Sequence, residues 1–129
     1  MWIAGEWCDS EDGATADIIN PATGEVIATT PKATIGDVER CVAASKQALH
    51  SKEWAAMDPA QRGRVLQKMA ATTYAQAKSL AALESSNNGK TFREALSEIR
   101  YGAWTLEYFA GLSDKIEGST IPVLSLIHI

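Results

Sequence analysis

A change in the spacing of apolar residues near Thr34 constrains the fold more than any other feature of this sequence. Before it, short β-branched runs alternate with turns rich in Gly and Pro, a pattern typical of strands. After it, apolar residues recur at intervals of three and four, the period of an amphipathic helix. The sequence therefore predicts β-hairpins followed by long helices, an α/β chain in which helix predominates.

The segment before residue 34 is expected to form two strand pairs. Trp2–Ala4 and Glu6–Cys8 flank a glycine and can form a short pair. Asp17–Asn20 and Glu25–Thr29 are separated by the turn sequence Pro21–Gly24. The proline fixes φ at the entry of that turn and the glycine supplies a positive φ at its exit, so this segment is interpreted as a β-hairpin.

Helices are predicted after the hairpins, each with a capping signal at its N-terminus. The first starts at Thr34, with Asp37 three residues later, and its apolar residues keep helical spacing over about four turns. The second starts at Asp58–Gln61, where a proline suits the first helical position. It is expected to continue as a single helix to Asn87–Gly89, where the glycine can take a left-handed cap.

The third predicted helix starts at Thr91, with Glu94 three residues later, and its apolar stripe runs to about Asp114. Gly102 lies inside this helix, where glycine costs about 1 kcal/mol relative to alanine. A kink or a close contact between helices is therefore expected at Gly102. An extended segment, Ser119–Val123, is expected after the helix.

The charge and hydropathy patterns exclude two classes of partner. The net charge is −4, from 12 Lys and Arg against 16 Asp and Glu, and the basic residues form no stripe, which disfavours nucleic-acid binding. No stretch approaches the roughly 18 apolar residues of a membrane helix, and no signal-peptide pattern is present. We therefore expect a soluble cytoplasmic protein. Cys8 and Cys41 lie far apart without a CxxC motif, so both are expected to be reduced thiols.

No common catalytic or phosphate-binding motif occurs in the sequence. G-x-G-x-x-G, G-x-x-x-x-G-K-[ST], H-E-x-x-H and G-x-S-x-G are all missing. Residues that could do chemistry are therefore first interpreted as structural. Cys41 is expected near the apolar stripe of the first helix, Cys8 is expected to be structural as well, and His50 is expected at that helix's C-terminal end, where a cation is favourable.

Two interpretations remain open for the turn Asn87–Lys90. It can bind an anion, but a stop for the second helix explains it more simply. Acidic side chains of the last two helices are expected to form solvated ion pairs with nearby basic ones. The acidic residues are Glu84, Glu94, Glu98 and Glu107, and the basic residues are Lys90, Arg93 and Arg100.

Several short segments of the sequence are each uninformative, but their order and spacing together indicate a resemblance to a known family. They are Ile3–Trp7, Ile19–Ala28, Leu83–Lys90, Tyr108–Ile116 and Gly118–Pro122. Together, over residues 2–123, they resemble the N-terminal part of the NAD(P)-dependent aldehyde dehydrogenases. The resemblance implies a Rossmann-like parent fold, in which residues 1–123 are a partial N-terminal segment of the cofactor-binding domain. The helices would then pack on a sheet whose parallel strands lie mostly beyond residue 129.

The resemblance also implies a chemistry, the oxidation of an aldehyde to a carboxylic acid with hydride transfer to NAD or NADP. In that family a cysteine thiolate forms a thiohemiacetal with the substrate, and an asparagine and a backbone N–H stabilise the oxyanion. Those groups, a glutamate that activates water and the cofactor loop come later than the matched segment. No catalytic or cofactor-binding residue is therefore assigned here. The chain alone is expected to be inactive, and the parent is expected to be a homodimer or homotetramer.

One site of the family falls within this chain. Some members bind a structural potassium or sodium ion, and its ligands would here be the backbone carbonyls of Ile18 and Ile19 and the side chain of Asn87. Family members carry an acidic residue at the position of Asn87. An amide oxygen can still bind a hard cation, but the lost charge implies a weaker site.

The end of the sequence, residues 124–129, departs from the family pattern. It resembles an in-frame translation of a sequencing-library adapter, so we expect a non-native tail there. A rival hypothesis treats the chain as a free-standing helical module that lays its apolar faces on a partner protein. The two hypotheses differ in whether the source gene continues past residue 123 through a cofactor loop, a glutamate and a cysteine.

Overall fold

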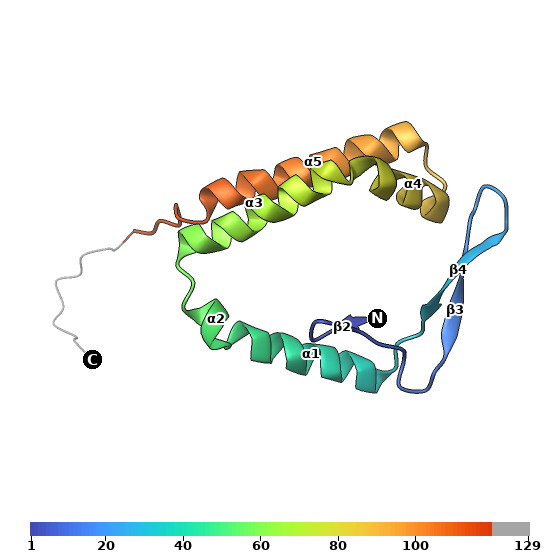
Figure 1. Cartoon of the computed structure of the whole chain (residues 1–129), viewed down its shortest axis with the longest axis horizontal. Coiled ribbons are helices and arrows are strands. Elements are labelled where there is room, and N and C mark those ends of the chain that lie inside the picture. Colours follow the sequence, from blue (N-terminus) through green and yellow to red (C-terminus); the bar gives the residue numbers. More distant parts are fainter. Residues whose placement is uncertain (120–129) are drawn as a thin grey trace.

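The computed structural model describes residues 1–119, which form a mixed α/β chain in which helix predominates (Figure 1). The expected tail at 124–129, and all but the first residue of the expected segment Ser119–Val123, lie outside the described residues. The elements are, in order, β1 (Trp2–Ile3), β2 (Glu6–Trp7), β3 (Thr15–Ile19), β4 (Val26–Pro31), α1 (Ile35–Leu49), α2 (Lys52–Ala55), α3 (Pro59–Ala75), α4 (Ala77–Asn88) and α5 (Phe92–Leu112).

Both predicted strand pairs are confirmed as antiparallel ribbons. β1 pairs with β2 so that Trp2 lies opposite Trp7, and the two rings meet edge to face with their centroids 5.2 Å apart. β3 pairs with β4 around the predicted turn, whose Gly24 has a φ of 76°. The pairing is irregular between Ile18 and Ile19, where a β-bulge disrupts the regular hydrogen-bond ladder.

The first helix begins with the predicted capping box. The Thr34 hydroxyl accepts a hydrogen bond from the Asp37 N–H, and the Asp37 carboxylate accepts one from the Thr34 N–H. The short helix α2 follows it and has too few residues to show any periodicity in the sequence. Ser51 caps α2, and the Arg62 guanidinium lies over the ring of its Trp54 at 5.1 Å from the centroid.

The expectation of a single second helix is wrong, because the helix is broken at Gln76 into α3 and α4. Gln76 leaves helical geometry with φ −98° and ψ 7°. Close to the break, the Thr73 hydroxyl donates to the Met69 carbonyl and the Ser79 hydroxyl donates to the Gln76 carbonyl. Side chains that bond back to the helix in this way often bend it. The bend allows both helices to bury small residues along α5.

Both outer ends of this helix pair are as predicted. Asp58 and Gln61 form a complete capping box, with Pro59 at the start of α3. Gly89 caps α4 in the left-handed conformation. These ends were predictable because each depends on a few neighbouring residues.

The last helix starts at Thr91 as predicted, but its capping box is incomplete. The Thr91 hydroxyl accepts a hydrogen bond from the Glu94 N–H. The Glu94 carboxylate accepts from the Thr91 hydroxyl instead of reaching the Thr91 backbone. The helix ends at Leu112, slightly before the predicted end near Asp114.

The expectation for Gly102 is also wrong. α5 continues through this residue, and an added Cβ would meet no atom within 4 Å. The close approach between helices lies at Gly63 of α3. There an added Cβ would stand 2.3 Å from Ser113 Oγ and 2.8 Å from the carbonyl oxygen of Ala110. Glycine is therefore required where α3 passes the end of α5.

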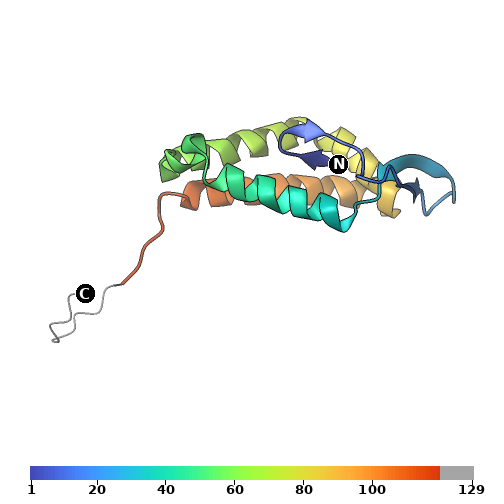
Figure 2. The same ribbon diagram turned by 90° about the horizontal axis from the view of Figure 1, so that it is seen from below.

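The elements form two regions that differ in their packing. In the three-helix region, residues 58–114, α3 and α4 lie along α5 (Figure 1). In the N-terminal region, residues 1–57, the β1–β2 ribbon lies against α1, and the β3–β4 hairpin occupies the end next to α4 (Figure 1). Seen from below, the axis of α1 is roughly aligned with the axes of α3 and α5 (Figure 2).

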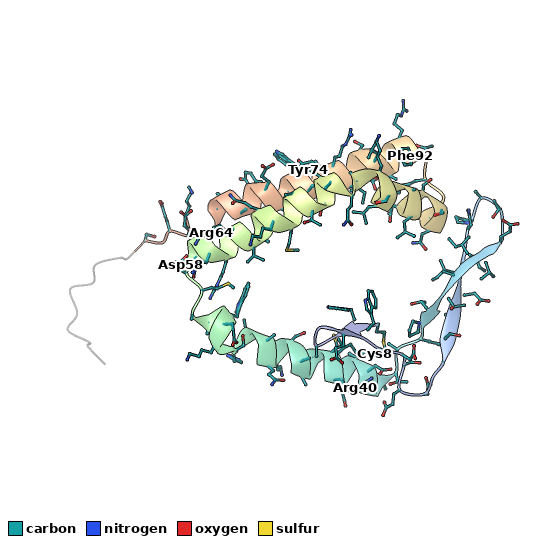
Figure 3. The ribbon with its side chains drawn as sticks, viewed as in Figure 1. Cys8, Arg40, Asp58, Arg64, Tyr74 and Phe92 are labelled. Atoms are coloured by element: carbon teal, nitrogen blue, oxygen red, sulfur yellow. The ribbon has the colours of Figure 1, made fainter. Side chains whose placement is uncertain are left out.

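The buried apolar core of the described residues consists of alanines. These are Ala70, Ala77, Ala81, Ala95, Ala103 and Ala110. The largest fully buried side chain is that of Asp37, whereas large apolar side chains such as Tyr74 and Phe92 are exposed (Figure 3). The chain exposes 10320 Å², although a compact protein of its mass would expose about 6,700 Å². Large apolar side chains exposed together on a surface are typical of contact with further polypeptide.

Candidate functional site

The predicted cation ligands lie where the β3–β4 hairpin meets the end of α4 (Figure 1). Ile18 from β3 and Asn87 from α4 line one cavity. Ile19, the third predicted ligand, follows Ile18 on the strand but does not line that cavity. The other lining residues are Ile27, Ala28, Leu83, Glu84 and Ser86. The structure therefore brings two of the three predicted residues into one cavity.

Two features beside this cavity interrupt regular backbone hydrogen bonding. The register passes from Ile18 opposite Ala28 to Ile19 opposite Val26, so Ile27 of β4 is the extra residue of a bulge that interrupts the β-ladder. Asn87 lies in the last turn of α4, where helix carbonyls lack intrahelical partners and the helix dipole is negative. Oxygen ligands of this kind suit a hard cation.

The turn between α4 and α5 holds the hairpin against this cavity. Gly89 has a φ of 80°, and an added Cβ there would stand 2.8 Å from the Cγ of Pro21 in the hairpin turn. The Ser85 hydroxyl donates to the Lys90 carbonyl at 2.7 Å, which closes the turn. The interpretation of Asn87–Lys90 as a helix stop is confirmed.

An ion-pair network lies beside the cavity, centred on Lys90. Its ammonium group donates to the Glu98 carboxylate and lies 3.7 Å from an oxygen of Glu84. The hydrogen bond to Glu98, together with the nearby negative charge of both carboxylates, raises the pKa of Lys90. The same oxygen of Glu84 accepts a hydrogen bond from the Asn88 amide at 2.7 Å. The ion pairs predicted for Glu84 and Glu98 are thus confirmed.

Besides its ion pair with Lys90, Glu84 also lines the cavity shared by Ile18 and Asn87, which the sequence alone did not indicate. It places a carboxylate close to the position where family members were expected to supply one. Its spacing of three residues from Asn87, on the same face of a helix, is the signal that could have identified it.

A second polar cluster surrounds Asp37, which is 1% exposed. Its carboxylate accepts hydrogen bonds from the Thr34 N–H at 2.9 Å and the Glu11 N–H at 3.2 Å, and it pairs with the Arg40 guanidinium. The Thr34 backbone bond and then the Arg40 bond hold the pKa of Asp37 well below its usual range. This cluster fastens the loop around Glu11 to the start of α1.

The cysteines and His50 gather no catalytic partners within residues 1–119. Cys8 is half-buried, lies beside α1 in Figure 3, and its Sγ is 3.7 Å from the Met1 carbonyl oxygen. Cys41 is exposed and lines a groove with Trp2 and Ile3 instead of packing in a core. His50 is the C-cap of α1, as predicted.

The described part of the chain also lacks two features. It holds no cluster of three or more His, Cys, Asp or Glu side chains that could bind a metal ion. None of its helices is both long and apolar enough to cross a membrane.

Comparison with known proteins gives consistent matches. Residues 7–128 match the sequence model of the aldehyde dehydrogenase family. The chain is 48% identical over 124 residues to (Z)-2-((N-methylformamido)methylene)-5-hydroxybutyrolactone dehydrogenase of Acinetobacter baylyi, covering 95% of this chain and 25% of that protein. It is 39% identical to cytosolic 10-formyltetrahydrofolate dehydrogenase of Xenopus tropicalis, covering 95% of this chain and 14% of that protein.

The comparison with solved structures also matches the chain to aldehyde dehydrogenases. The chain superposes on a point mutant of betaine aldehyde dehydrogenase from Staphylococcus aureus in complex with NAD+, with a TM-score of 0.90 and 35% identity, covering 97% of this chain and 25% of that one. The fold is thus that of a segment of an α/β oxidoreductase. The chain belongs to the aldehyde dehydrogenase family. It spans a quarter or less of the length of these relatives.

Proposed function

We propose that the whole protein oxidises an aldehyde to a carboxylic acid and transfers hydride to NAD or NADP. The observation that carries this proposal is the family match over residues 7–128. The NAD+ complex of the Staphylococcus aureus relative supports the choice of cofactor class. We further propose a cytoplasmic enzyme that assembles as a homodimer or homotetramer, as the family resemblance implies.

The described residues do not themselves fit a dinucleotide. A phosphate cradle of the usual kind needs a glycine-rich turn between a parallel strand and a helix N-terminus. Within residues 1–119 the strands form antiparallel ribbons, and no such turn leads into a helix. No step of hydride transfer is therefore derived from this chain, and none of its residues is assigned to the cofactor.

The role proposed for this chain is structural. Residues 1–123 would form part of the cofactor-binding domain, and the boundary at residue 123 and the non-native character of 124–129 remain predictions. The chain's apolar faces support this role, because large side chains such as Val38, Val42 and Leu83 are exposed, whereas the buried apolar side chains of the described residues are all alanines. Such faces are expected on a scaffold that other parts of a larger subunit cover.

A chimera tests the proposal directly. Residues 7–119 of this chain would replace the corresponding segment of the Staphylococcus aureus betaine aldehyde dehydrogenase, and reduction of NAD+ by betaine aldehyde would be followed by absorbance. We expect the chimera to retain activity to within about a hundredfold, since a scaffold displaced by about 1 Å can cost that much. The 129-residue chain assayed alone should give no turnover.

Matched variants control for folding of the chimera. Gly102→Ala opens onto empty space and should leave its activity unchanged, whereas Gly63→Val should reduce the yield of folded chimera. A chimera that folds and binds NAD+ but has no activity would contradict the proposal. Turnover by the 129-residue chain alone would contradict the structural role.

We also propose that the cavity between the hairpin and α4 binds a potassium or sodium ion through Ile18, Ile19 and Asn87. The interrupted pairing beside Ile18 and Ile19, where β4 carries the bulge, and the negative end of α4 support this site. Glu84, which lines the same cavity, adds a carboxylate that partly compensates for the neutral side chain of Asn87. Its pairing with Lys90 weakens that compensation.

A further inference from the structure

We propose that the Asn88–Gly89 bond is a deamidation site, at which the asparagine amide is converted to a carboxylate when the end of α4 opens. In the folded chain Asn88 is the last residue of α4 and Gly89 is its C-cap. The reaction needs only these two residues and water. The proposal concerns the chemistry of this turn and does not depend on the proposed oxidation of an aldehyde or on a bound cation.

The reaction has two steps and uses water as its only co-reactant. In the first step the backbone nitrogen of Gly89 gives up its proton and attacks Cγ of Asn88. An N–Cγ bond forms, the Cγ–Nδ2 bond breaks, and ammonia leaves with the proton, so that a succinimide ring remains. In the second step water opens the ring at either carbonyl and leaves an aspartate or an isoaspartyl linkage. The sum is one water consumed and one ammonia released, with no change in oxidation state.

Among the asparagines of the sequence, Asn88 has the most reactive neighbour. Asparagine is one of the thermolabile residues of proteins, and this chain carries Asn20, Asn87 and Asn88. Asn20 precedes Pro21, whose nitrogen has no proton to give up. Asn87 precedes Asn88, whose side chain stands beside the attacking nitrogen. Only Asn88 is followed by a glycine, which has no side chain and a freely rotating backbone.

The folded end of α4 keeps the attacking nitrogen away from the side chain. Ring closure requires the Gly89 nitrogen to approach Asn88 Cγ, which needs a backbone rotation of Asn88 outside the helical region. Asn88 belongs to α4 and has helical geometry instead. The Gly89 N–H also donates a hydrogen bond to the Ser85 carbonyl at 2.9 Å, so its proton is held in the helix. The nucleophile is therefore withheld while the helix end stays closed.

The side chain of Asn88, in contrast, is polarised for attack. Its amide donates to the Glu84 carboxylate at 2.7 Å, and its carbonyl oxygen accepts a hydrogen bond from the Lys90 N–H at 3.0 Å. A backbone N–H at this oxygen stabilises the negative charge that develops there as the ring closes. Because the electrophile is prepared and only the nucleophile is withheld, opening of the helix end controls the rate.

The hydroxyl of Ser85 fastens this helix end. It donates to the Lys90 carbonyl at 2.7 Å and so ties the last turn of α4 to the residue beyond Gly89. The neighbouring Ser86 has the same hydroxyl but donates it to the Ala82 and Leu83 carbonyls, within its own helix. Helix ends open locally more easily than the rest of a fold. Loss of the Ser85 hydroxyl should therefore increase the open fraction, whereas loss of the Ser86 hydroxyl should not.

Deamidation would change the junction between α4 and the hairpin. It replaces the amide that donates to Glu84 by a carboxylate, so a hydrogen bond becomes a repulsion between like charges. The isoaspartyl product also lengthens the main chain by one carbon next to Gly89. An added Cβ at Gly89 would already stand 2.8 Å from Cγ of Pro21, so there is no room for a displaced backbone. The modification should thus loosen the contact of the hairpin with α4 irreversibly.

Mass spectrometry of proteolytic peptides tests the site and its control by the fold. The 129-residue chain would be incubated at mildly alkaline pH in buffer and in urea, and conversion of amide to carboxyl would be followed at each asparagine. We expect conversion at Asn88 in urea to exceed that at Asn20 and Asn87. In buffer the rate at Asn88 should be lower by about tenfold or more, because the open state is a minor one.

Two serine variants form a matched pair, since both exchange a serine for an alanine in the last turns of α4 and gain the same helix propensity. In buffer, Ser85→Ala should deamidate at Asn88 about two- to tenfold faster than Ser86→Ala, the effect of losing one hydrogen bond. In urea the two variants should react at equal rates. Hydrogen exchange of the Gly89 N–H should show the same order in buffer, and circular dichroism would confirm that each variant keeps its helices.

Four outcomes would overturn the proposal. The first is no conversion at Asn88 in urea, which would mean that this bond is not a deamidation site. The second is an equal rate in buffer and in urea, which would mean that the helix end does not protect it. The third is an equal rate for Ser85→Ala and Ser86→Ala in buffer. The last is conversion at position 88 in Asn88→Gln, whose longer side chain cannot form the succinimide ring.

Discussion

The two regions of the molecule are held together by different forces. The three-helix region is held by close packing of small residues, with Ala70, Ala103 and Gly63 at its contacts. The N-terminal region buries no large apolar side chain, and its best buried group is the carboxylate of Asp37. The first depends on shape and the second on hydrogen bonds, so the two should respond to different perturbations.

This difference also bears on the proposed role. Close helix packing through alanines brings backbones together but buries little apolar area, since the methyl group of alanine is small. The larger apolar side chains are left for contacts outside the described residues. The three-helix region is therefore held by close backbone approach, whereas the N-terminal region is fastened chiefly at one polar cluster.

The largest expected effect comes from adding a methyl group to the packed region. Gly63→Ala places a Cβ 2.8 Å from the Ala110 carbonyl oxygen, a backbone atom that can move little. We expect the free energy of unfolding to fall by about 1–3 kcal/mol, the usual cost of overpacking. Urea unfolding followed by circular dichroism would measure it.

The matched control is the same substitution at Gly102, another glycine inside a helix of this region. Gly102→Ala lies in α5 with open space around it, so it should raise the free energy of unfolding by up to about 1 kcal/mol through helix propensity alone. The two glycine variants are thus expected to differ in sign. If both stabilise the chain, the close contact at Gly63 does not exist.

A smaller effect, confined to the N-terminal region, is expected from acid. The pKa of Asp37 is held well below its usual range in the folded chain by the Thr34 N–H and Arg40. Its contribution to stability is therefore present above the ordinary carboxyl pKa of about 3.9 and is lost as the pH falls below that value. Asp37→Asn should reduce stability at neutral pH and flatten its decline in acid.

Hydrogen exchange locates this effect. The Glu11 N–H, which donates to Asp37, should exchange faster in Asp37→Asn, whereas amides of α5 should be unchanged. Asp17→Asn removes an exposed carboxylate from β3 and serves as the control. Equal acceleration in both regions would show that they unfold as one unit and that the contrast between them is wrong.

The contrast also explains which parts of the fold could be predicted from the sequence. The hairpin turn at Pro21–Gly24 and the caps at Thr34 and Asp58 were predictable, because each depends on interactions within a few residues. The break at Gln76 and the requirement for glycine at position 63 depend on contact with α5. No local pattern distinguishes Gly63 from Gly102, since both are glycines inside helices.

The candidate site shows the same limit. Ile18 and Asn87 were named together only through the family resemblance, because nothing local in the sequence relates a strand to a helix end so far along the chain. The sequence predicts a solvated ion pair for Glu84, and the structure confirms one with Lys90. Its place in the cavity became visible only when the hairpin was seen to lie against α4.

The smallest expected effect concerns the cavity where the two regions meet. If a monovalent cation binds there, replacing the neutral amide by a carboxylate should strengthen binding, because oxygen ligands with negative charge hold a hard cation more tightly. Asn87→Asp should therefore melt at a higher temperature in potassium or sodium chloride than in choline chloride at equal ionic strength. The unsubstituted chain should show a smaller difference of the same sign.

Asn88→Asp adds the same charge one residue further along α4, at a position that does not line the cavity. An identical salt response in Asn88→Asp would mean that the cation acts on the general charge of the helix end, and the site at Ile18, Ile19 and Asn87 would have to be abandoned.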